Sequence, residues 1–205
     1  MALPLSRAGQ VLSVCHKEIS VKRLATIASS LCLYLATALP AHAANKTWKI
    51  TDSEVTFQAV GKPGFIRING KNAKVNGPTD WDGSQLKGAY TVQISELDTG
   101  LSLRDQHMKD KYLEVKKYPE AILTLDPIPW NASAEAKVPF KGKLKLHGVE
   151  QAVEGQAKLS PSGNQLHVEA SFELILSQYK IDIPVYAGIT VAEKVDVKVT
   201  FDAKE

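Results

Sequence analysis

The feature that most limits how this chain can fold is a regular alternation of apolar and polar side chains. The alternation is longest at residues 166–176, and it recurs at 55–59, 90–94, 140–146 and 195–201. Successive side chains of a β-strand point to opposite faces of a sheet, so a period of two predicts strands with one buried and one solvated face. These runs therefore predict a fold built mainly from half-buried strands.

Turn-forming residues separate these runs, as at Asn76-Gly77-Pro78 and His147-Gly148, and leave room for about eight strands. Many long strands favour a closed antiparallel barrel or a sandwich, and periodicity alone does not separate the two. A barrel has the advantage that it leaves no strand edge exposed. With about eight strands, its interior is either filled by side chains or holds one small ligand.

One segment, residues 102–117, departs from the alternation. It contains no glycine or proline, and its apolar residues recur at roughly helical spacing. Ser102 is predicted to cap the amino end of a short helix, with Asp105 at the third helical position. The segment ends at Tyr118-Pro119, and a further strand is predicted at 121–125.

The amino-terminal region has the pattern of a secretory signal peptide. Lys22-Arg23 precede an apolar run at 24–39, and an Ala-His-Ala sequence follows that ends at Ala43. Cleavage is expected after Ala43, which would remove residues 1–43 and leave 44–205 as one domain in the periplasm. The stretch before Lys22 is long for such a peptide, so translation from Met1 and from Val21 both remain open.

The charge balance of the predicted exported chain is neutral. The whole sequence has 25 basic and 22 acidic residues, and the leader holds four of the basic and one of the acidic ones, so 21 of each remain. Only two of these are arginines, Arg67 and Arg104, which argues against a nucleic-acid partner. Both cysteines, Cys15 and Cys32, lie in the leader, so no disulfide or thiolate is expected after export.

The sequence contains no recognisable catalytic or metal-binding motif. His107, His147 and His167 are too far apart for a short metal-binding motif, and they are interpreted as structural or surface histidines. There is no nucleophile elbow and no glycine-rich phosphate loop. The residues 80–83 are interpreted as a turn. No cofactor and no metal is therefore expected.

Three motifs resemble those of a known family. Residues 102–108 read SLRDQHM, residues 112–119 read YLEVKKYP, and residues 142–149 read GKLKLHGV. Together they resemble the YceI-like, polyisoprenoid-binding family of secreted lipocalin-like proteins, and the similarity spans 47–203. The sequence departs from the family pattern at Asp52-Ser53, where the family commonly has an Asp-Pro-x-His-Ser type sequence.

The resemblance implies an all-β, extended eight-stranded antiparallel barrel with one short helix near one end. Family members hold a long isoprenoid, quinone-like or fatty-acyl chain in an interior tunnel. Burial of such a chain gains about 0.8 kcal/mol per CH₂ group, so a long tail binds without a polar anchor. The predicted tunnel lining comprises Phe57, Tyr90, Val92, Ile94, Met108, Leu113, Phe140, Leu144, Phe172 and Leu174. The alternative is that these side chains fill a solid core.

The most distinctive polar residues are Arg104, Asp105 and His107. On a functional interpretation, Arg104 or His107 contacts the phosphate or carbonyl of a ligand headgroup near the barrel opening. On a structural interpretation, Arg104 and Asp105 fix the helix to the barrel and His107 satisfies a buried backbone carbonyl. The structural interpretation is favoured.

The function predicted from the sequence is a periplasmic, non-enzymatic carrier for a long-chain isoprenoid, quinone or fatty-acyl ligand. One alternative is a ligand-free stress or interaction module with a filled barrel. Another is an enzyme that acts on a lipid, with His107 or His147 as acid–base group. The lysines that point outward, such as Lys141, Lys143 and Lys145, are most simply interpreted as part of a solvated strand face. They would also permit a transient contact with a membrane or a membrane enzyme. An edge-free barrel is compatible with a monomer or a homodimer.

Overall fold

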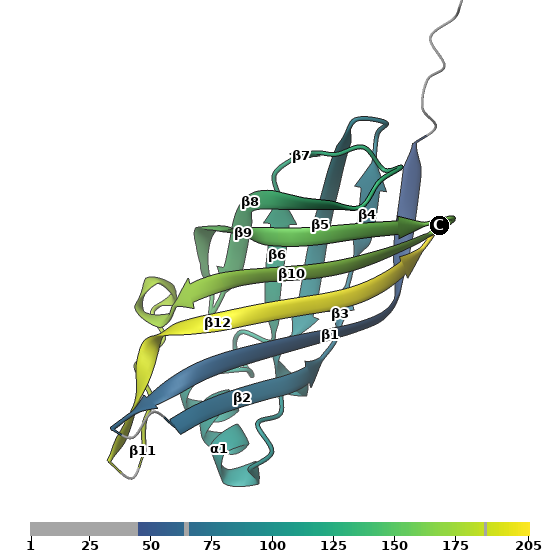
Figure 1. Cartoon of the computed structure of the whole chain (residues 1–205). Coiled ribbons are helices and arrows are strands. Elements are labelled where there is room, and N and C mark those ends of the chain that lie inside the picture. The colour runs from purple at the N-terminus through teal and green to yellow at the C-terminus, as the bar shows by residue number, and fades with distance from the viewer. Residues whose placement is uncertain (1–44, 64–65, 187) are drawn as a thin grey trace, which may run out of the picture. The chain divides into compact units, whose positions relative to one another are not determined.

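The computed structural model describes residues 45–63, 66–186 and 188–205, and the predicted signal peptide lies outside them. These residues form long strands joined by short turns, with one helical segment between β5 and β6 (Figure 1). The strands are β1 (Lys46–Lys62), β2 (Ile66–Ala73), β3 (Val75–Asn76), β4 (Pro78–Trp81), β5 (Gln85–Gln93), β6 (Glu120–Leu125), β7 (Ile128–Pro129), β8 (Ala136–Leu146), β9 (Val149–Ser162), β10 (Gln165–Ile175), β11 (Val185–Tyr186) and β12 (Ile189–Lys204). The helical elements are η2 (Ile94–Glu96), α1 (Ser102–Gln106), η3 (His107–Tyr112) and η4 (Leu176–Tyr179).

The sheet closes on itself as an antiparallel barrel. Neighbouring strands follow the order β12-β10-β9-β8-β6-β5-β4-β1, and β1 pairs in turn with β12. The closing pair is long, because β1 and β12 are paired from Lys49 opposite Lys204 to Lys62 opposite Thr190, with register shifts at 50–52 and at 59–61. The strands β2, β3 and β4 are consecutive pieces of one interrupted strand beside β1, so the ring has eight strand positions. The predicted eight-stranded barrel is confirmed, and the sandwich alternative is wrong.

The helical segment starts differently from the sequence-based prediction. Ser102 is already the first helical residue, the capping position belongs to Leu101, and no side chain caps the helix. The helix starts there because the Asp105 amide donates its hydrogen bond to the Leu101 carbonyl. The Asp105 carboxylate bonds instead to Thr99, ahead of the helix. The strand predicted at 121–125 is confirmed as β6.

The turn predicted at residues 80–83 is present only in part, because Asp80 and Trp81 belong to β4 and the turn lies at 82–84. The Asp82 carboxylate accepts hydrogen bonds from the backbone amides of Ser84 and Gln85. Gly83 takes a positive φ of 97°, which a residue without a Cβ adopts freely. The hydrogen bond from the Lys87 ammonium, followed by these two amide bonds, holds the pKa of Asp82 well below its ordinary value.

One end of the barrel is solid. Trp48, Trp81 and Trp130 are all buried there, and the rings of Trp48 and Trp130 lie 6.2 Å apart. The Trp81 indole donates a 3.0 Å hydrogen bond to the Trp130 carbonyl, which joins β4 to the residue after β7. We call these three residues the tryptophan plug. Figure 1 shows β4 and β7 at the upper end of the barrel and α1 at the lower end, so the plug closes the end opposite the helix.

Candidate functional site

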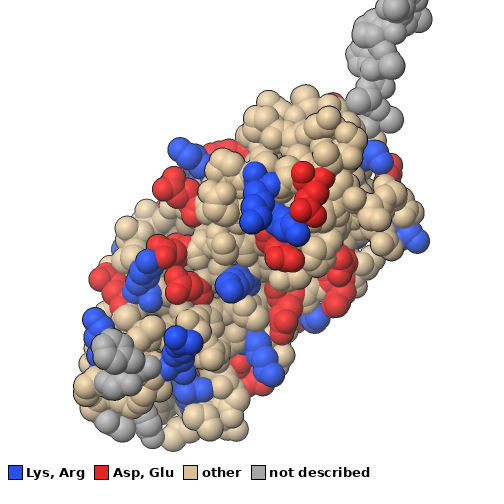
Figure 2. Space-filling view, viewed as in Figure 1, with Lys and Arg blue, Asp and Glu red and all other residues tan. Residues whose placement is uncertain are grey.

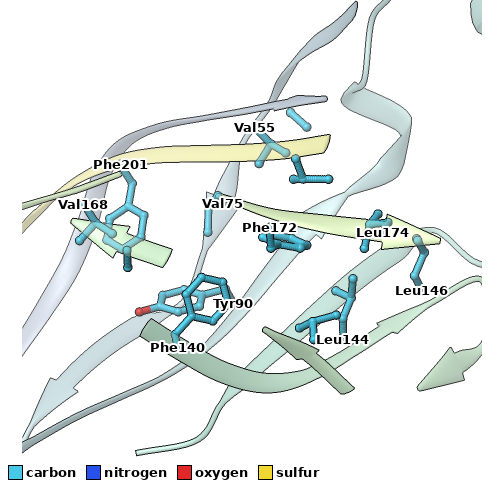
Figure 3. Packing of buried hydrophobic residues seen from close by; sticks show 14 of the residues in the cluster. Val55, Val75, Tyr90, Phe140, Leu144, Leu146, Val168, Phe172, Leu174 and Phe201 are labelled. Carbon is cyan, nitrogen blue, oxygen red and sulfur yellow. The ribbon is translucent and has the colours of Figure 1, made fainter. Parts of the chain in front are cut away.

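The interior of the barrel beyond the tryptophan plug is hollow. It holds a cavity of about 650 Å³, which we call the pouch. The inward side chains of the ring strands form its wall. Figure 3 shows Val55 of β1, Leu144 of β8, and Phe172 and Leu174 of β10 directed into the same space. The wall is almost wholly apolar because the buried face of each alternating strand points inward. Phe140 and Phe172 meet edge to face in this wall, with ring centres 6.0 Å apart.

Every residue predicted from sequence to line a tunnel contributes to the wall of the pouch. The residues are Phe57, Tyr90, Val92, Ile94, Met108, Leu113, Phe140, Leu144, Phe172 and Leu174. The structure thus brings the ten side chains together around one space, although ligand binding by them stays a prediction. The shape differs from the expected tunnel, because the three indoles of the plug lie outside the wall and fill one end.

The pouch opens beside α1. Ile66, Leu101 and Leu103 line it and are nevertheless 43%, 58% and 52% exposed to solvent. They come from β2, from the loop before α1 and from α1 itself. In the described chain no ladder joins β2 to β5, which pairs instead with β3 and β4. An isolated bridge from Lys71 to Asp98 connects β2 to the loop before α1. The helical segment thus borders the opening, which we call the mouth.

Two hydroxyl groups lie on the wall away from the mouth. Thr79 and Tyr90 are buried, and their oxygen atoms are 2.9 Å apart. Figure 3 shows the Tyr90 hydroxyl on the side of Phe201, away from Leu174. Burial raises the pKa of Tyr90 to about 12, so the phenol stays neutral. The inner end of the pouch therefore carries a satisfied, uncharged polar pair.

Arg104 and Asp105 join the mouth loop to the helix through Thr99. Arg104 donates from Nε to the Thr99 hydroxyl (2.8 Å) and from Nη2 to the Thr99 carbonyl (2.6 Å). The Thr99 amide and hydroxyl donate to the Asp105 carboxylate at 2.8 and 2.6 Å. Burial opposes the charge of Asp105, but the Thr99 bonds outweigh it and keep its pKa below the ordinary value. These bonds thus hold the helix to the loop before it, whereas the link to the barrel in the structural interpretation stays a prediction.

The two predicted headgroup residues also lie at the pouch. Arg104 uses two of its five N–H groups on Thr99, and its side chain lines the cavity. His107 lines the cavity as well and is exposed. Among the described residues that form the wall, these two are the only ones of a basic or acidic type.

His147 has a more specific setting than the sequence indicated. Its Nε2 lies 2.9 Å from a carboxylate oxygen of Glu114, and its Nδ1 lies 3.1 Å from the carbonyl oxygen of Tyr179. The Tyr118 ring packs edge-on against the imidazole, with centres 4.6 Å apart. These contacts, which we call the His147 clasp, join the chain after η3 to the β8–β9 turn and to η4. The GKLKLHGV motif was the available sequence signal, but it does not reveal the partners.

Within the described residues, no three His, Cys, Asp or Glu side chains are grouped so that they could hold a metal ion. Nor does that part of the chain contain a helix with the length and apolar character needed to cross a membrane.

A closed antiparallel barrel with an apolar interior and a helix at its open end defines a lipocalin-like barrel. Residues 48–203 match the YceI-like domain, and the chain belongs to this family. A comparison with the curated proteins found no match.

Solved structures have the same fold at low sequence identity. A polyisoprenoid binding domain from Saccharophagus degradans, implicated in plant cell wall breakdown, is 16% identical with a TM-score of 0.63, over 77% of this chain and 97% of that one. BcnA from Burkholderia cenocepacia is 21% identical with a TM-score of 0.62, over 74% and 96%. The Campylobacter jejuni YCEI protein is 18% identical with a TM-score of 0.54, over 67% and 85%.

Proposed function

We propose that this protein is an exported, non-enzymatic carrier that encloses the apolar chain of a long amphiphile in the pouch. The observation that carries the proposal is a cavity of about 650 Å³ whose described wall has no basic or acidic side chain except Arg104 and His107. An isoprenoid or isoprenoid quinone is the first candidate ligand, and a fatty-acid derivative is the second. The periplasm is the proposed compartment, because the signal-peptide pattern directs export.

The energetic reason is the insolubility of a long tail in water. Each buried CH₂ group contributes about 0.8 kcal/mol, so ten of them contribute roughly 8 kcal/mol before the cost of association. That cost is about 4–15 kcal/mol, so a short tail gains little and a long tail is retained. Affinity should therefore rise with tail length until the pouch is full.

The distribution of polar groups sets the orientation of the ligand. The inner end has only the paired hydroxyls of Thr79 and Tyr90, which satisfy each other, whereas Arg104 and His107 lie near the mouth. A charged headgroup at the inner end would lose its hydration without a counter-charge. The tail is therefore proposed to point toward the tryptophan plug, with the headgroup at the mouth.

The relatives support the ligand class without establishing it. One structural neighbour is described as a polyisoprenoid binding domain, and at 16% identity this likeness extends to the fold alone. The volume of the pouch argues against the alternative in which side chains fill the barrel.

The test is native mass spectrometry of the exported protein, purified from its own cells without detergent, followed by extraction and fragmentation of any bound lipid. The amino-terminal residue of the same sample tests cleavage after Ala43. Delipidated protein is then titrated with geranylgeraniol and with palmitate. The matched variants are Ala170→Phe, which places a ring in the pouch, and Ser171→Phe, its outward-facing neighbour on β10.

We expect a discrete co-purifying lipid that the Ala170→Phe variant loses and the Ser171→Phe variant retains. Equal retention by both variants would show that the lipid binds outside the pouch, which would overturn the proposal. Failure of the delipidated protein to take up either probe would favour a ligand-free module instead.

A further inference from the structure

The large apolar side chains that remain exposed are concentrated at the mouth. Among the described residues they are Ile66, Leu101, Leu103 and Val185, which are 43%, 58%, 52% and 56% exposed. The first three line the pouch opening. Val185 lies in β11, and its backbone meets the Tyr112 hydroxyl of η3 at 3.3 and 3.4 Å. We call these four residues the mouth rim. Apolar side chains gathered in one exposed place mark an interaction surface.

The segments that carry the mouth rim are basic, although the predicted exported chain is neutral. Residues 60–68, 101–112 and 180–191 together hold six basic and three acidic residues. The rest of 44–205 holds the other fifteen basic and eighteen acidic residues. On the barrel wall in view, Figure 2 shows basic and acidic side chains interspersed, without a patch of one sign. The excess of positive charge is therefore located on the same segments as the mouth rim.

An apolar surface with flanking basic groups fits an anionic lipid bilayer. The apolar side chains enter the region between headgroups and acyl chains, and the basic groups attract anionic headgroups. The position of the rim adds a reason, since a ligand tail that leaves the pouch through water exposes all of its apolar surface. A mouth seated on a bilayer lets the tail pass directly between two apolar environments.

We propose that the mouth rim docks onto the surface of an anionic lipid bilayer and that the amphiphile passes between pouch and bilayer there. The proposal rests on the proposed carrier function and adds its partner. A second copy of this chain and a membrane protein are the other occupants that the experiment tests.

The first part of the experiment measures co-sedimentation of delipidated protein with vesicles. One set of vesicles contains phosphatidylcholine alone, and the other contains equal parts of phosphatidylcholine and phosphatidylglycerol. We expect binding to the anionic vesicles that falls as salt is added, because salt screens attraction between exposed charges. Absence of binding, or binding to both sets that is equal and independent of salt, would overturn the proposal.

The second part tests the apolar residues. Val185→Ser changes the mouth rim without altering the pouch wall, and it is combined with Leu103→Ser in a double variant. Both residues are more than half exposed, so unchanged thermal unfolding is expected. The double variant should weaken partition into anionic vesicles by ~10-fold. Unchanged partition would overturn the role of the mouth rim.

The third part compares two pairs of lysines that carry the same charge. Lys109→Gln with Lys111→Gln removes two charges beside the mouth, and Lys141→Gln with Lys143→Gln removes two from the outer face of β8. The first pair should weaken vesicle binding by about 25-fold, since each charge contributes roughly a factor of five. The second pair should leave it unchanged. Equal losses would show that binding follows net charge and would overturn docking at the mouth.

Failure of this proposal is distinguishable from failure of the carrier function. Wild-type protein that retains lipid but ignores vesicles would refute docking and leave the carrier function intact. Protein that binds vesicles through the mouth rim but takes up no lipid would refute the carrier function alone. A dimer in light scattering that Leu103→Ser with Val185→Ser dissociates, without vesicle binding, would assign the rim to a second copy of the chain. Vesicle binding that needs an added membrane protein would assign it to that protein.

Discussion

Leu166 and Leu174 point to the same side of β10, but the structure gives them different surroundings. Leu166 is 0% exposed and lies outside the pouch wall, whereas Leu174 is 9% exposed and lines the pouch. Leu174 therefore has empty space on one side where Leu166 has packed atoms. The same substitution to alanine at the two positions measures what that space contributes to stability.

The expected losses follow from the contacts that each side chain makes. A buried Leu→Ala substitution costs about 2–5 kcal/mol, and the cost is greatest where the surroundings are fully packed. We expect Leu166→Ala to cost about 4–5 kcal/mol and Leu174→Ala about 2–3 kcal/mol, since a side chain facing a void has fewer dispersion contacts to lose. A difference of about 2 kcal/mol corresponds to roughly 4–8 °C in Tm for a chain of this size.

The assay is urea unfolding of delipidated protein, with thermal unfolding repeated in the presence of saturating geranylgeraniol. The two variants should have the same m value, so that the midpoints compare stability directly. Ligand should raise the Tm of Leu166→Ala as much as that of the wild type, but the Tm of Leu174→Ala less, because this variant binds the tail more weakly. Equal losses of stability without ligand, or a greater loss at Leu174, would refute the division into a solid end and a hollow end.

Three further outcomes follow from single contacts. His167→Asn should lower Tm below about pH 6.5, and the loss should shrink as the pH rises. The reason is that the Asp202 hydrogen bond raises the pKa of His167, so its stabilisation is lost as the pH climbs through that raised value. Thermal unfolding from acid to alkaline pH checks this, and a pH-independent difference in Tm would contradict it. Glu114→Gln should weaken the His147 clasp by about 1 kcal/mol or less. Amide hydrogen exchange should become faster in the residues after η3, while β8 and β9 stay protected. Unaltered exchange in the residues after η3 would contradict the clasp. Gly70→Ala should cost about 1–3 kcal/mol and reduce lipid uptake, because the added Cβ would overlap the Phe57 ring and push it into the pouch; full uptake of geranylgeraniol would argue otherwise.

The solid end and the hollow end of the barrel have different roles. The tryptophan plug and its neighbours bury large side chains and supply stability, which a chain without disulfides in the described barrel draws from its core. The pouch wall gives up part of this packing and gains a binding volume. The clasp and the Thr99 network then hold the helical segment beside the mouth.

The wall of the barrel could be predicted from the sequence because strand geometry is local. The alternation at 166–176 predicted which residues of β10 face inward, and Phe172 and Leu174 do so. The same argument placed Phe140 and Leu144 of β8 in the interior. The position of the helical segment was also predictable from its composition. Its capping residue was not, because Leu101 takes that position when the Asp105 amide bonds to the Leu101 carbonyl and the Asp105 carboxylate bonds to Thr99.

Only the tertiary structure decided where the interior is filled and where it is open. Leu166 and Leu174 occupy equivalent positions in one alternating run, and nothing in that run indicates that one is packed and the other borders a cavity. The difference arises because Trp48, Trp81 and Trp130, which are far apart in sequence, meet at one end. An alternating pattern thus determines the direction of each side chain, because direction depends on the backbone of the residue itself. The volume left in the middle and the apolar residues left exposed at the mouth depend on all the strands that surround them, and they are settled only when the barrel closes.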